Sequence, residues 1–193
     1  MNRLDLVVGP NGAGKSTFIA FTLAPLLPRS VVVNADEIAR QRWPQAPTSH
    51  AYDAAQVAAD TRARLIEVAR SFIAETVFSH PSKLDLIRAA HAGGFTVVLH
   101  VLLVPEDLAV ERVRHRVQAG GHDVPENKIR QRHRRLWALV ANAIALSDIT
   151  TIYDNSRLRG PRIVAQLSGG DIVGSPDWPG WAPEALRSRW PTS

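Results

Sequence analysis

The segment GPNGAGKST, residues 9–17, constrains the fold of this chain of 193 residues more than any other feature. It follows an apolar run, Leu4–Val8, and precedes a segment of helical period that begins at Lys15. A glycine-rich loop between a strand and a helix directs backbone N–H groups at phosphate oxygens, and the helix dipole adds to the attraction. The loop therefore predicts a P-loop, with Lys15 near the β- and γ-phosphates and the Ser16 hydroxyl on Mg²⁺. The residues expected to contact ATP are those of the loop: Gly9, Pro10, Asn11, Gly12, Ala13, Gly14, Lys15, Ser16 and Thr17.

The composition narrows the class of protein further. With 45% of its 193 residues hydrophobic, the chain is expected to form a single domain over residues 1–193. It contains no cysteine, which excludes disulfides, thiolate zinc sites and cysteine nucleophiles. The longest apolar run, 95–104, is about half of the ~20 residues that a membrane helix requires, and residues 1–5 leave no room for a signal peptide. We therefore expect a cytoplasmic protein. Its formal charge of +5 favours anionic ligands, nucleotides and nucleic acids alike.

Apolar runs alternate with segments of helical period along most of the chain. This alternation predicts an α/β fold, a doubly wound parallel sheet of five strands with helices on both faces. From about 160 to 193 we expect a hairpin and a tryptophan-rich tail that docks on the domain, the alternative being a partner-binding or base-stacking surface. The expected strands are 4–8, 31–33, 72–76, 95–104 and 149–153, and the expected helices start at Lys15, Pro81, Pro105 and Pro125, with further helical segments up to about Arg70.

The ends of the other strands bear on whether the terminal phosphate goes to water or to an acceptor. A common motor ATPase needs a strand that ends in adjacent acids, and no expected strand does. Instead, the segment Asn34–Glu37 follows the second strand, and Glu75 and Thr76 end the third. Transfer to a hydroxyl requires a carboxylate that accepts its proton. Asp36 is the first candidate, or else the N-cap of a helix starting at Glu37. Glu75 is the second candidate, or only the polar end of a strand, and Thr76 would bind substrate or Mg²⁺.

Residues 111–135 hold most of the surplus positive charge. At 100° per residue, Arg116 lies on the apolar stripe of the first helix here, and Arg132 flanks the stripe of the second. An arginine on an apolar face needs an anionic partner, because burying an unpaired charge is costly. That partner is either a protein carboxylate or the transferring phosphoryl group. In the second case the glycines of residues 120–123 would let a short lid, about 117–127, close over the nucleotide.

These motifs together are similar to those of the zeta-toxin-like P-loop kinases, and more closely to the shorter bacterial group labelled predicted ABC-type ATPase. The resemblance implies an adenylate-kinase-like core, ATP with Mg²⁺ as donor, and transfer to a sugar hydroxyl, with UDP-N-acetylglucosamine the acceptor in zeta toxins proper. It also raises an antitoxin protein as a partner. The segments that carry it are GPNGAGKST at 9–17, NADEIAR at 34–40, ET at 75–76, RVQAGGHDVPENKIRQR at 116–132 and YDNS at 153–156.

The resemblance assigns roles by motif position. Asp36 matches the family's catalytic aspartate and Lys15 its phosphate-loop lysine. Arg116 and Arg132 match its two transition-state arginines, and because their spacing differs, a neighbouring arginine, 112 or 135, is the substitute for either.

Two further sets of residues follow from the same resemblance. The family's substrate-contacting Glu and Thr match Glu75 and Thr76, although its intervening glycine is absent, and with them we expect Asn34 and Asp36 to contact the acceptor. Asn155 lies in a loop that passes near the adenine in similar kinases and is expected to contact ATP; otherwise this loop is a plain strand-ending turn.

The sequence thus predicts an ATP- and Mg²⁺-dependent phosphotransferase with a hydroxyl acceptor and a parallel sheet of order 2-3-1-4-5. One alternative is a polynucleotide 5′-hydroxyl kinase or an RNA-binding ATPase, since the arginine-rich segment would also suit nucleic acid. Exposed aromatics usually accompany such a surface, and this segment offers only Trp137. The second alternative is a nucleotide-dependent switch without an acceptor.

Overall fold

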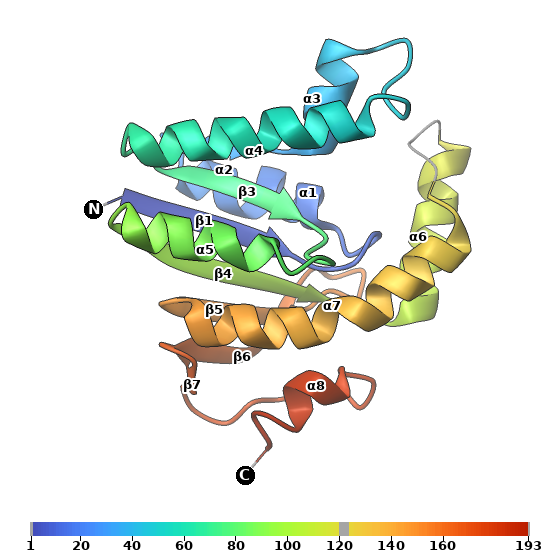
Figure 1. The fold of residues 1–193 in the computed structure, drawn as a ribbon. Coiled ribbons are helices and arrows are strands. Elements are labelled where there is room, and N and C mark those ends of the chain that lie inside the picture. The colour runs from blue at the N-terminus through green and yellow to red at the C-terminus, as the bar shows by residue number, and fades with distance from the viewer. Residues whose placement is uncertain (1, 120–123, 193) are drawn as a thin grey trace.

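The computed structural model describes residues 2–119 and 124–192, which form an α/β fold around one sheet of seven strands (Figure 1). The strand order is β2-β3-β1-β4-β5-β6-β7, so the predicted order 2-3-1-4-5 is confirmed for the parallel part. The prediction of five strands was too low, because the C-terminal hairpin pairs antiparallel with β5 and extends the sheet. The strands are β1 (Asn2–Val8), β2 (Val31–Val33), β3 (Phe72–Thr76), β4 (Phe95–Leu103), β5 (Ile149–Asp154), β6 (Arg162–Ser168) and β7 (Asp171–Ile172).

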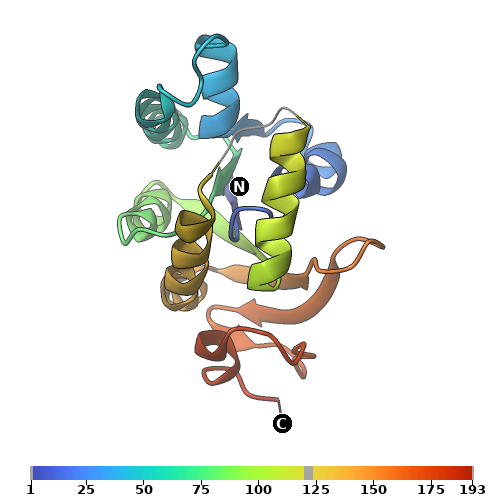
Figure 2. The ribbon, with the colours of Figure 1, turned by 90° about the vertical axis from the view of Figure 1, so that its right-hand side faces the viewer.

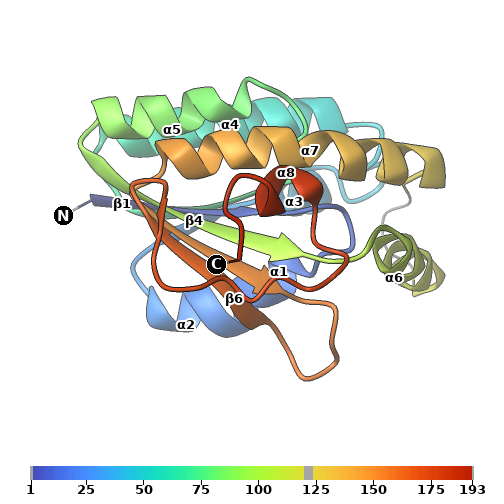
Figure 3. The same cartoon turned by 90° about the horizontal axis from the view of Figure 1, so that it is seen from below.

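Helices cover both faces of the sheet (Figure 3). Seen from below, α4, α5 and α7 lie above the strands, while α1 and α2 lie under them. The helical elements are α1 (Lys15–Phe18), the π-helical turn η1 (Ile19–Leu23), α2 (Ala24–Leu26), α3 (Ala35–Arg42), α4 (Ala51–Glu67), α5 (Lys83–Ala92), α6 (Glu106–Gln118), α7 (Glu126–Leu146) and α8 (Glu184–Arg187).

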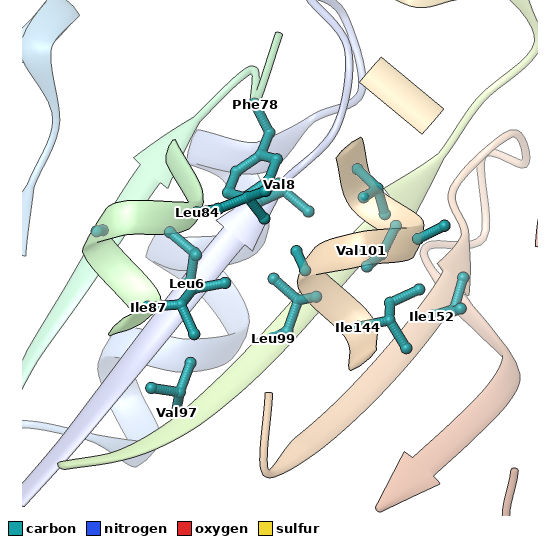
Figure 4. Close-up of a cluster of buried hydrophobic side chains, with 14 of the residues drawn as sticks. Leu6, Val8, Phe78, Leu84, Ile87, Val97, Leu99, Val101, Ile144 and Ile152 are labelled. Atoms are coloured by element: carbon teal, nitrogen blue, oxygen red, sulfur yellow. The ribbon is translucent and has the colours of Figure 1, made fainter. Parts of the chain in front are cut away.

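The two faces of the sheet bury two apolar clusters, because central parallel strands are covered on both sides. Leu6 and Val8 of β1 belong to the larger cluster, together with side chains of α5 and α7 (Figure 4). Val7, which points to the other face, packs with Phe18 of α1 and Val113 of α6. The packing of both clusters fixes β1, so the loop that follows it leaves the sheet at a defined position.

The C-terminal tail lies against the sheet through two tryptophans. Trp178 Nε1 donates a hydrogen bond to the Trp190 carbonyl oxygen at 2.8 Å, and Trp190 Nε1 donates to the Gly170 carbonyl oxygen at 2.9 Å. Leu186 of α8 is fully buried. The indole N–H groups therefore find backbone partners as the rings become buried.

The carboxyl ends of the parallel strands form the edge where the sequence expects its site. Figure 2 looks toward this edge, and α6 crosses it in front of the segment that joins β1 to α1. The predicted lid, about 117–127, corresponds to the end of α6 and the start of α7, and its central residues 120–123 lie outside the described residues.

Candidate active site

The phosphate loop is closed in by the backbone of α6 and by the side chain of Asn155. Gly12 and Gly14 have φ angles of +78° and +83°, which other residues rarely adopt. A Cβ at Gly12 would lie 2.4 Å from the Ala109 carbonyl oxygen of α6, and a Cβ at Gly14 would lie 2.7 Å from Nδ2 of Asn155. The loop is thus a cradle of bare backbone, the form that phosphate binding requires.

Lys15 begins α1, and its side chain turns back into the loop, where only 7% of it is exposed. Its Nζ donates hydrogen bonds to the carbonyl oxygens of Gly9 and Pro10, both at 3.1 Å. The nearest carboxylate oxygen, from Glu75 at the end of β3, is 4.0 Å away. A buried ammonium at this distance from its counter-charge favours a further anion beside it.

The charges around Lys15 identify which other side chains reach the loop. Burial lowers the pKa of Lys15, and the negative charges of Glu75 and Asp36 act against this effect. The positive charge of Arg116 lowers the pKa further. Asp36 and Arg116 come from distant parts of the sequence, and both lie within electrostatic reach of Lys15.

Glu75 joins three elements at the edge of the sheet. Its carboxylate accepts hydrogen bonds from the Ser16 hydroxyl of α1, at 2.9 and 3.1 Å, and from Nδ2 of Asn34, at 2.5 Å. β3 lies between β1 and β2 in the sheet, so the end of β3 meets the residues that follow its two neighbours. The structure brings together three residues of the prediction, and a carboxylate beside a hydroxyl is a set of oxygen atoms of the type that Mg²⁺ prefers.

Asp36 lies in the first turn of α3, and the cap of this helix differs from the prediction. Asn34, not Asp36, is the N-cap, and its Oδ1 accepts hydrogen bonds from the backbone N–H groups of Asp36 at 2.8 Å and Glu37 at 3.3 Å. Helix α3 therefore begins at Ala35, two residues earlier than expected. Because Asn34 serves as the cap, the carboxylate of Asp36 is left exposed at the edge of the sheet.

The two arginines predicted for the phosphoryl group occupy different environments. Arg116 is exposed and stands in the last turn of α6, where its charge acts on Lys15. Arg132 of α7 is half-buried, and within residues 2–119 and 124–192 no carboxylate lies within ion-pair distance of it.

Most other arginines of this segment are paired with protein carboxylates. The carboxylates of Glu106, Asp107 and Glu126 accept hydrogen bonds from Arg130, Glu106 also accepts them from Arg134, and Arg114 pairs with Glu126. These contacts hold the start of α6 against α7. Of the two partners that the sequence left open, a protein carboxylate and the transferring phosphoryl group, these arginines have the first.

Asn155, which follows β5, and Arg112 of α6 both contact the phosphate loop. Nδ2 of Asn155 donates a hydrogen bond to the Ala13 carbonyl oxygen at 2.7 Å. Arg112 Nη1 donates a hydrogen bond to the Asn155 carbonyl oxygen at 2.9 Å. The same nitrogen lies 3.5 Å from the Gly12 carbonyl oxygen. From the sequence, Arg112 was expected only as a substitute for Arg116 or Arg132. Helical spacing shows the direction of a side chain, so it could not predict these contacts with backbone carbonyls.

Thr76 ends β3, and its hydroxyl oxygen accepts a hydrogen bond from the Phe78 backbone N–H at 3.3 Å. Phe78 is fully buried and has a φ of +61°, a conformation that costs energy for a bulky residue. Its ring packs against Val8 and Leu84 (Figure 4). The buried ring holds the turn from β3 to α5 in this strained form.

Two properties of the described part of the chain bear on the remaining expectations. No helix there is long and apolar enough to cross a membrane. Nor do the described residues contain a group of three or more His, Cys, Asp or Glu side chains arranged to hold a metal ion by themselves.

The fold and the loop define the class, an α/β protein with the P-loop kinase fold. Residues 4–139 match the AAA domain family, and the chain belongs to this family. An uncharacterized protein of Haemophilus influenzae is 29% identical over 133 residues, which are 68% of this chain and 93% of that protein.

Solved structures share the fold at low sequence identity. A chain of the PezAT chromosomal toxin–antitoxin system of Streptococcus pneumoniae has a TM-score of 0.67 and 14% identity, over 98% of this chain and 84% of that one. A chain of the AvrRxo1-ORF1:-ORF2 complex with ATP has a TM-score of 0.71 and 13% identity, over 90% of this chain and 60% of that one. A putative kinase from Chloroflexus aurantiacus has a TM-score of 0.57 and 21% identity, over 68% of this chain and 79% of that one.

Proposed function

We propose that this protein is an ATP- and Mg²⁺-dependent phosphotransferase of the zeta-toxin-like kind that acts on a hydroxyl of a small molecule. The observation that carries the proposal is that Lys15 is buried in the phosphate loop within the field of two carboxylates, Glu75 and Asp36. Glu75 is engaged by Ser16 and Asn34, whereas the Asp36 carboxylate is exposed. One carboxylate is thus tied to the loop while the other faces outward, where an acceptor would arrive.

The residues present fit a nucleotide with its metal ion. The bare backbone at Gly12 and Gly14 leaves room for phosphate oxygens, and Lys15 would neutralise part of their charge. The Ser16 hydroxyl and the Glu75 carboxylate would hold Mg²⁺. When bound, ATP with Mg²⁺ supplies a phosphoryl group with part of its charge neutralised.

Asp36 would act as the general base in this reaction. Its carboxylate would take the proton of the acceptor hydroxyl, whose oxygen bonds to the γ-phosphorus as the bond from this phosphorus to the bridging oxygen breaks. The products are ADP and a phosphate monoester of the acceptor. Arg116 and Arg132 would stabilise the charge that develops on the transferred group.

Two observations favour a small acceptor over a polynucleotide. The arginines that would track a nucleic-acid backbone along α7, Arg130 and Arg134, already bind Glu106. Trp137, the aromatic residue of that segment, is buried against His133 and is not available for base stacking.

The proposal is tested with γ-labelled ATP and a cell extract of small metabolites. We expect label to appear in a new phosphate monoester, and the first pure compound to test is UDP-N-acetylglucosamine. This choice follows from the resemblance of the motifs to those of zeta toxins, and the fold shared with a chain of the PezAT toxin–antitoxin system supports an antitoxin as a protein partner. ATP turnover without any labelled acceptor would contradict a phosphotransferase and favour the nucleotide-dependent switch.

A further inference from the structure

Side chains hold carbonyl oxygens of the phosphate loop from two sides. From within the loop, Lys15 Nζ donates hydrogen bonds to the carbonyl oxygens of Gly9 and Pro10, both at 3.1 Å. Lys15 is also the cation that would neutralise the phosphates, so its hold on these two carbonyls competes with that role. A second pair of carbonyls is held from outside the loop, where no such competition arises.

Asn155 links the sheet to the phosphate loop. Its backbone N–H donates a hydrogen bond to the Leu103 carbonyl oxygen at the end of β4, at 2.9 Å. Its side-chain Nδ2 donates to the Ala13 carbonyl oxygen at 2.7 Å, and the same nitrogen lies 2.7 Å from the position that a Cβ at Gly14 would take. Since both its backbone and its side chain are hydrogen-bonded, the Asn155 amide has a fixed position beside the loop.

Arg112 of α6 contacts both Asn155 and the loop. Its Nη1 donates to the Asn155 carbonyl oxygen at 2.9 Å and lies 3.5 Å from the Gly12 carbonyl oxygen. Figure 2 shows α6 in front of the segment that carries the loop. The side chain is half-buried, and in the part of the chain that the structure describes no carboxylate lies within ion-pair distance of it. Its donors are directed at backbone carbonyls, unlike those of Arg114, which pairs with Glu126.

These contacts determine which way two peptide groups of the loop face. In a trans peptide the C=O and the following N–H point in opposite directions, so a donor on the carbonyl also fixes the next N–H. The two peptide groups join residues 12 to 13 and 13 to 14, and each lies beside a glycine with positive φ, Gly12 or Gly14. Glycine lets a peptide group turn over most easily. A carbonyl oxygen that faced a phosphate would repel it, whereas an N–H group attracts it.

We propose that Arg112 and Asn155 are positioning residues that keep these two peptide groups in the orientation that binds phosphate. They act on the nucleotide through the loop and not by direct contact. This role differs from the one expected from the sequence, in which Asn155 contacts ATP near the adenine and Arg112 is a substitute for an arginine on the phosphoryl group. The inference rests on the proposed function in one respect, the binding of nucleotide phosphates at the loop.

ADP tests the role of Arg112, because ADP lacks the γ-phosphoryl group. In calorimetric titrations of the full chain with Mg²⁺, we expect Arg112→Gln to weaken ADP and ATP by the same factor, at least about tenfold. Arg114→Gln, an exposed arginine of the same helix, is the matched control and keeps the wild-type affinity. If Arg112→Gln weakens ATP alone, the guanidinium contacts the γ-phosphoryl group and the inference fails.

Salt separates a hydrogen bond from the effect of a distant charge. The loss in Arg112→Gln is measured at about 0.05 and 0.5 M salt, because ions screen a distant charge but leave a hydrogen bond largely intact. We expect the ratio of the wild-type and variant affinities for ADP to persist at the higher concentration. A ratio that falls to one means that Arg112 acts only as a distant charge, which overturns its role on the loop.

Inorganic triphosphate tests Asn155, because it lacks the adenine. We expect Asn155→Ala to weaken triphosphate and ATP by the same factor, about fivefold, the scale of one neutral hydrogen bond. Asn142→Ala, at an exposed asparagine of α7, is the control. Triphosphate that binds Asn155→Ala as tightly as the wild type assigns Asn155 to the adenine and overturns the inference. Triphosphate that does not bind the wild type would show that the loop is not held ready for phosphates, with the same consequence.

Steady-state transfer separates positioning from a merely structural role. The loop N–H groups bind the phosphates in the ground state and in the transition state alike, so both variants raise the KM for ATP and leave kcat within about threefold. A structural role lowers the fraction of folded enzyme, so a lower kcat at unchanged KM overturns the inference. If the wild type shows no transfer but the binding results hold, the phosphotransferase fails while the positioning role stands. A wild type that binds no ADP contradicts both.

Discussion

The Ser16 hydroxyl donates a hydrogen bond of 2.9 Å to the carboxylate of Glu75, so the first turn after the phosphate loop is tied directly to the end of the neighbouring strand β3. The same carboxylate accepts a second hydrogen bond from Asn34, which follows β2. Three successive strand ends of the sheet are therefore joined through one side chain. A substitution of Glu75 therefore alters hydrogen bonds both at the phosphate loop and at the start of α3.

Glu75→Gln is expected to lower phosphoryl transfer by at least about tenfold. A glutamine amide has one oxygen, so it cannot accept hydrogen bonds at two oxygens as the carboxylate does, and it removes a negative charge near Lys15. Steady-state rates with γ-labelled ATP measure the effect. Glu67→Gln, an exposed residue of α4, is the control. Wild-type rates in Glu75→Gln would contradict a role for this carboxylate.

Asp36→Asn is expected to leave ATP affinity nearly unchanged and to lower transfer at least ~10²-fold, the usual scale for the loss of a general base. The backbone N–H of residue 36, which binds the Asn34 side chain, is kept in this variant. Glu37→Gln is the matched control, since this exposed neighbour binds Arg40 and Gln41. Retained transfer in Asp36→Asn would refute the assignment of the base.

Lys15→Ala is expected to weaken nucleotide binding itself, because it removes the cation that is buried inside the loop. Calorimetric titration of the full chain with ATP and Mg²⁺ measures the affinity, and we expect a loss of at least about tenfold, the scale of one charge-assisted hydrogen bond. An unchanged affinity would count against the loop as the phosphate site.

The sequence was most informative where its signals are local. The strands were predicted within about two residues at each end because apolar runs bounded by polar residues mark them, and the P-loop motif located the site. The sequence was less informative about contacts between elements that are distant along the chain. Pairing of the hairpin with β5 and the contact of Arg112 with backbone carbonyls are of this kind. The cap at Asn34 is different, since an asparagine before two acids is a local signal that favours this residue as the cap.

Gly12→Ala is expected to destabilise the protein more than a positive φ alone would explain. A left-handed conformation costs an alanine about 1 kcal/mol, and a Cβ at this position would also lie 2.4 Å from the Ala109 carbonyl oxygen. We expect a loss of about 2–4 kcal/mol in the free energy of unfolding, with weaker ATP binding. Gly94→Ala is the matched control, because Gly94 has a φ of +75° and nothing within 4 Å of its Cβ position. Equal losses in both variants would show that α6 does not close on the loop.

A charge cluster on β1 and β4 predicts how stability depends on pH. Asp5 of β1 is fully buried, and it binds Arg3 through two hydrogen bonds of 2.6 and 2.7 Å and His100 of β4 at 2.9 Å. Burial acts to raise the pKa of Asp5, but the hydrogen bonds from His100 and Arg3 and their charges outweigh it, so the pKa is lowered. The stability that Asp5 contributes is thus present above its unfolded pKa of about 3.9 and is lost as the pH falls through the lower folded value.

Arg3→Gln is the variant that tests this cluster by acid unfolding. Without the guanidinium, the pKa of Asp5 in the folded state rises, so the protein protonates and unfolds at a higher pH than the wild type. Asp5→Asn is expected to cost about 3 kcal/mol at neutral pH, as for a buried ion pair that loses one partner, and to flatten the dependence of stability on acid pH. Urea unfolding between pH 3 and 7 measures both effects. If both variants keep the wild-type slope, the acid sensitivity of the fold does not arise at Asp5.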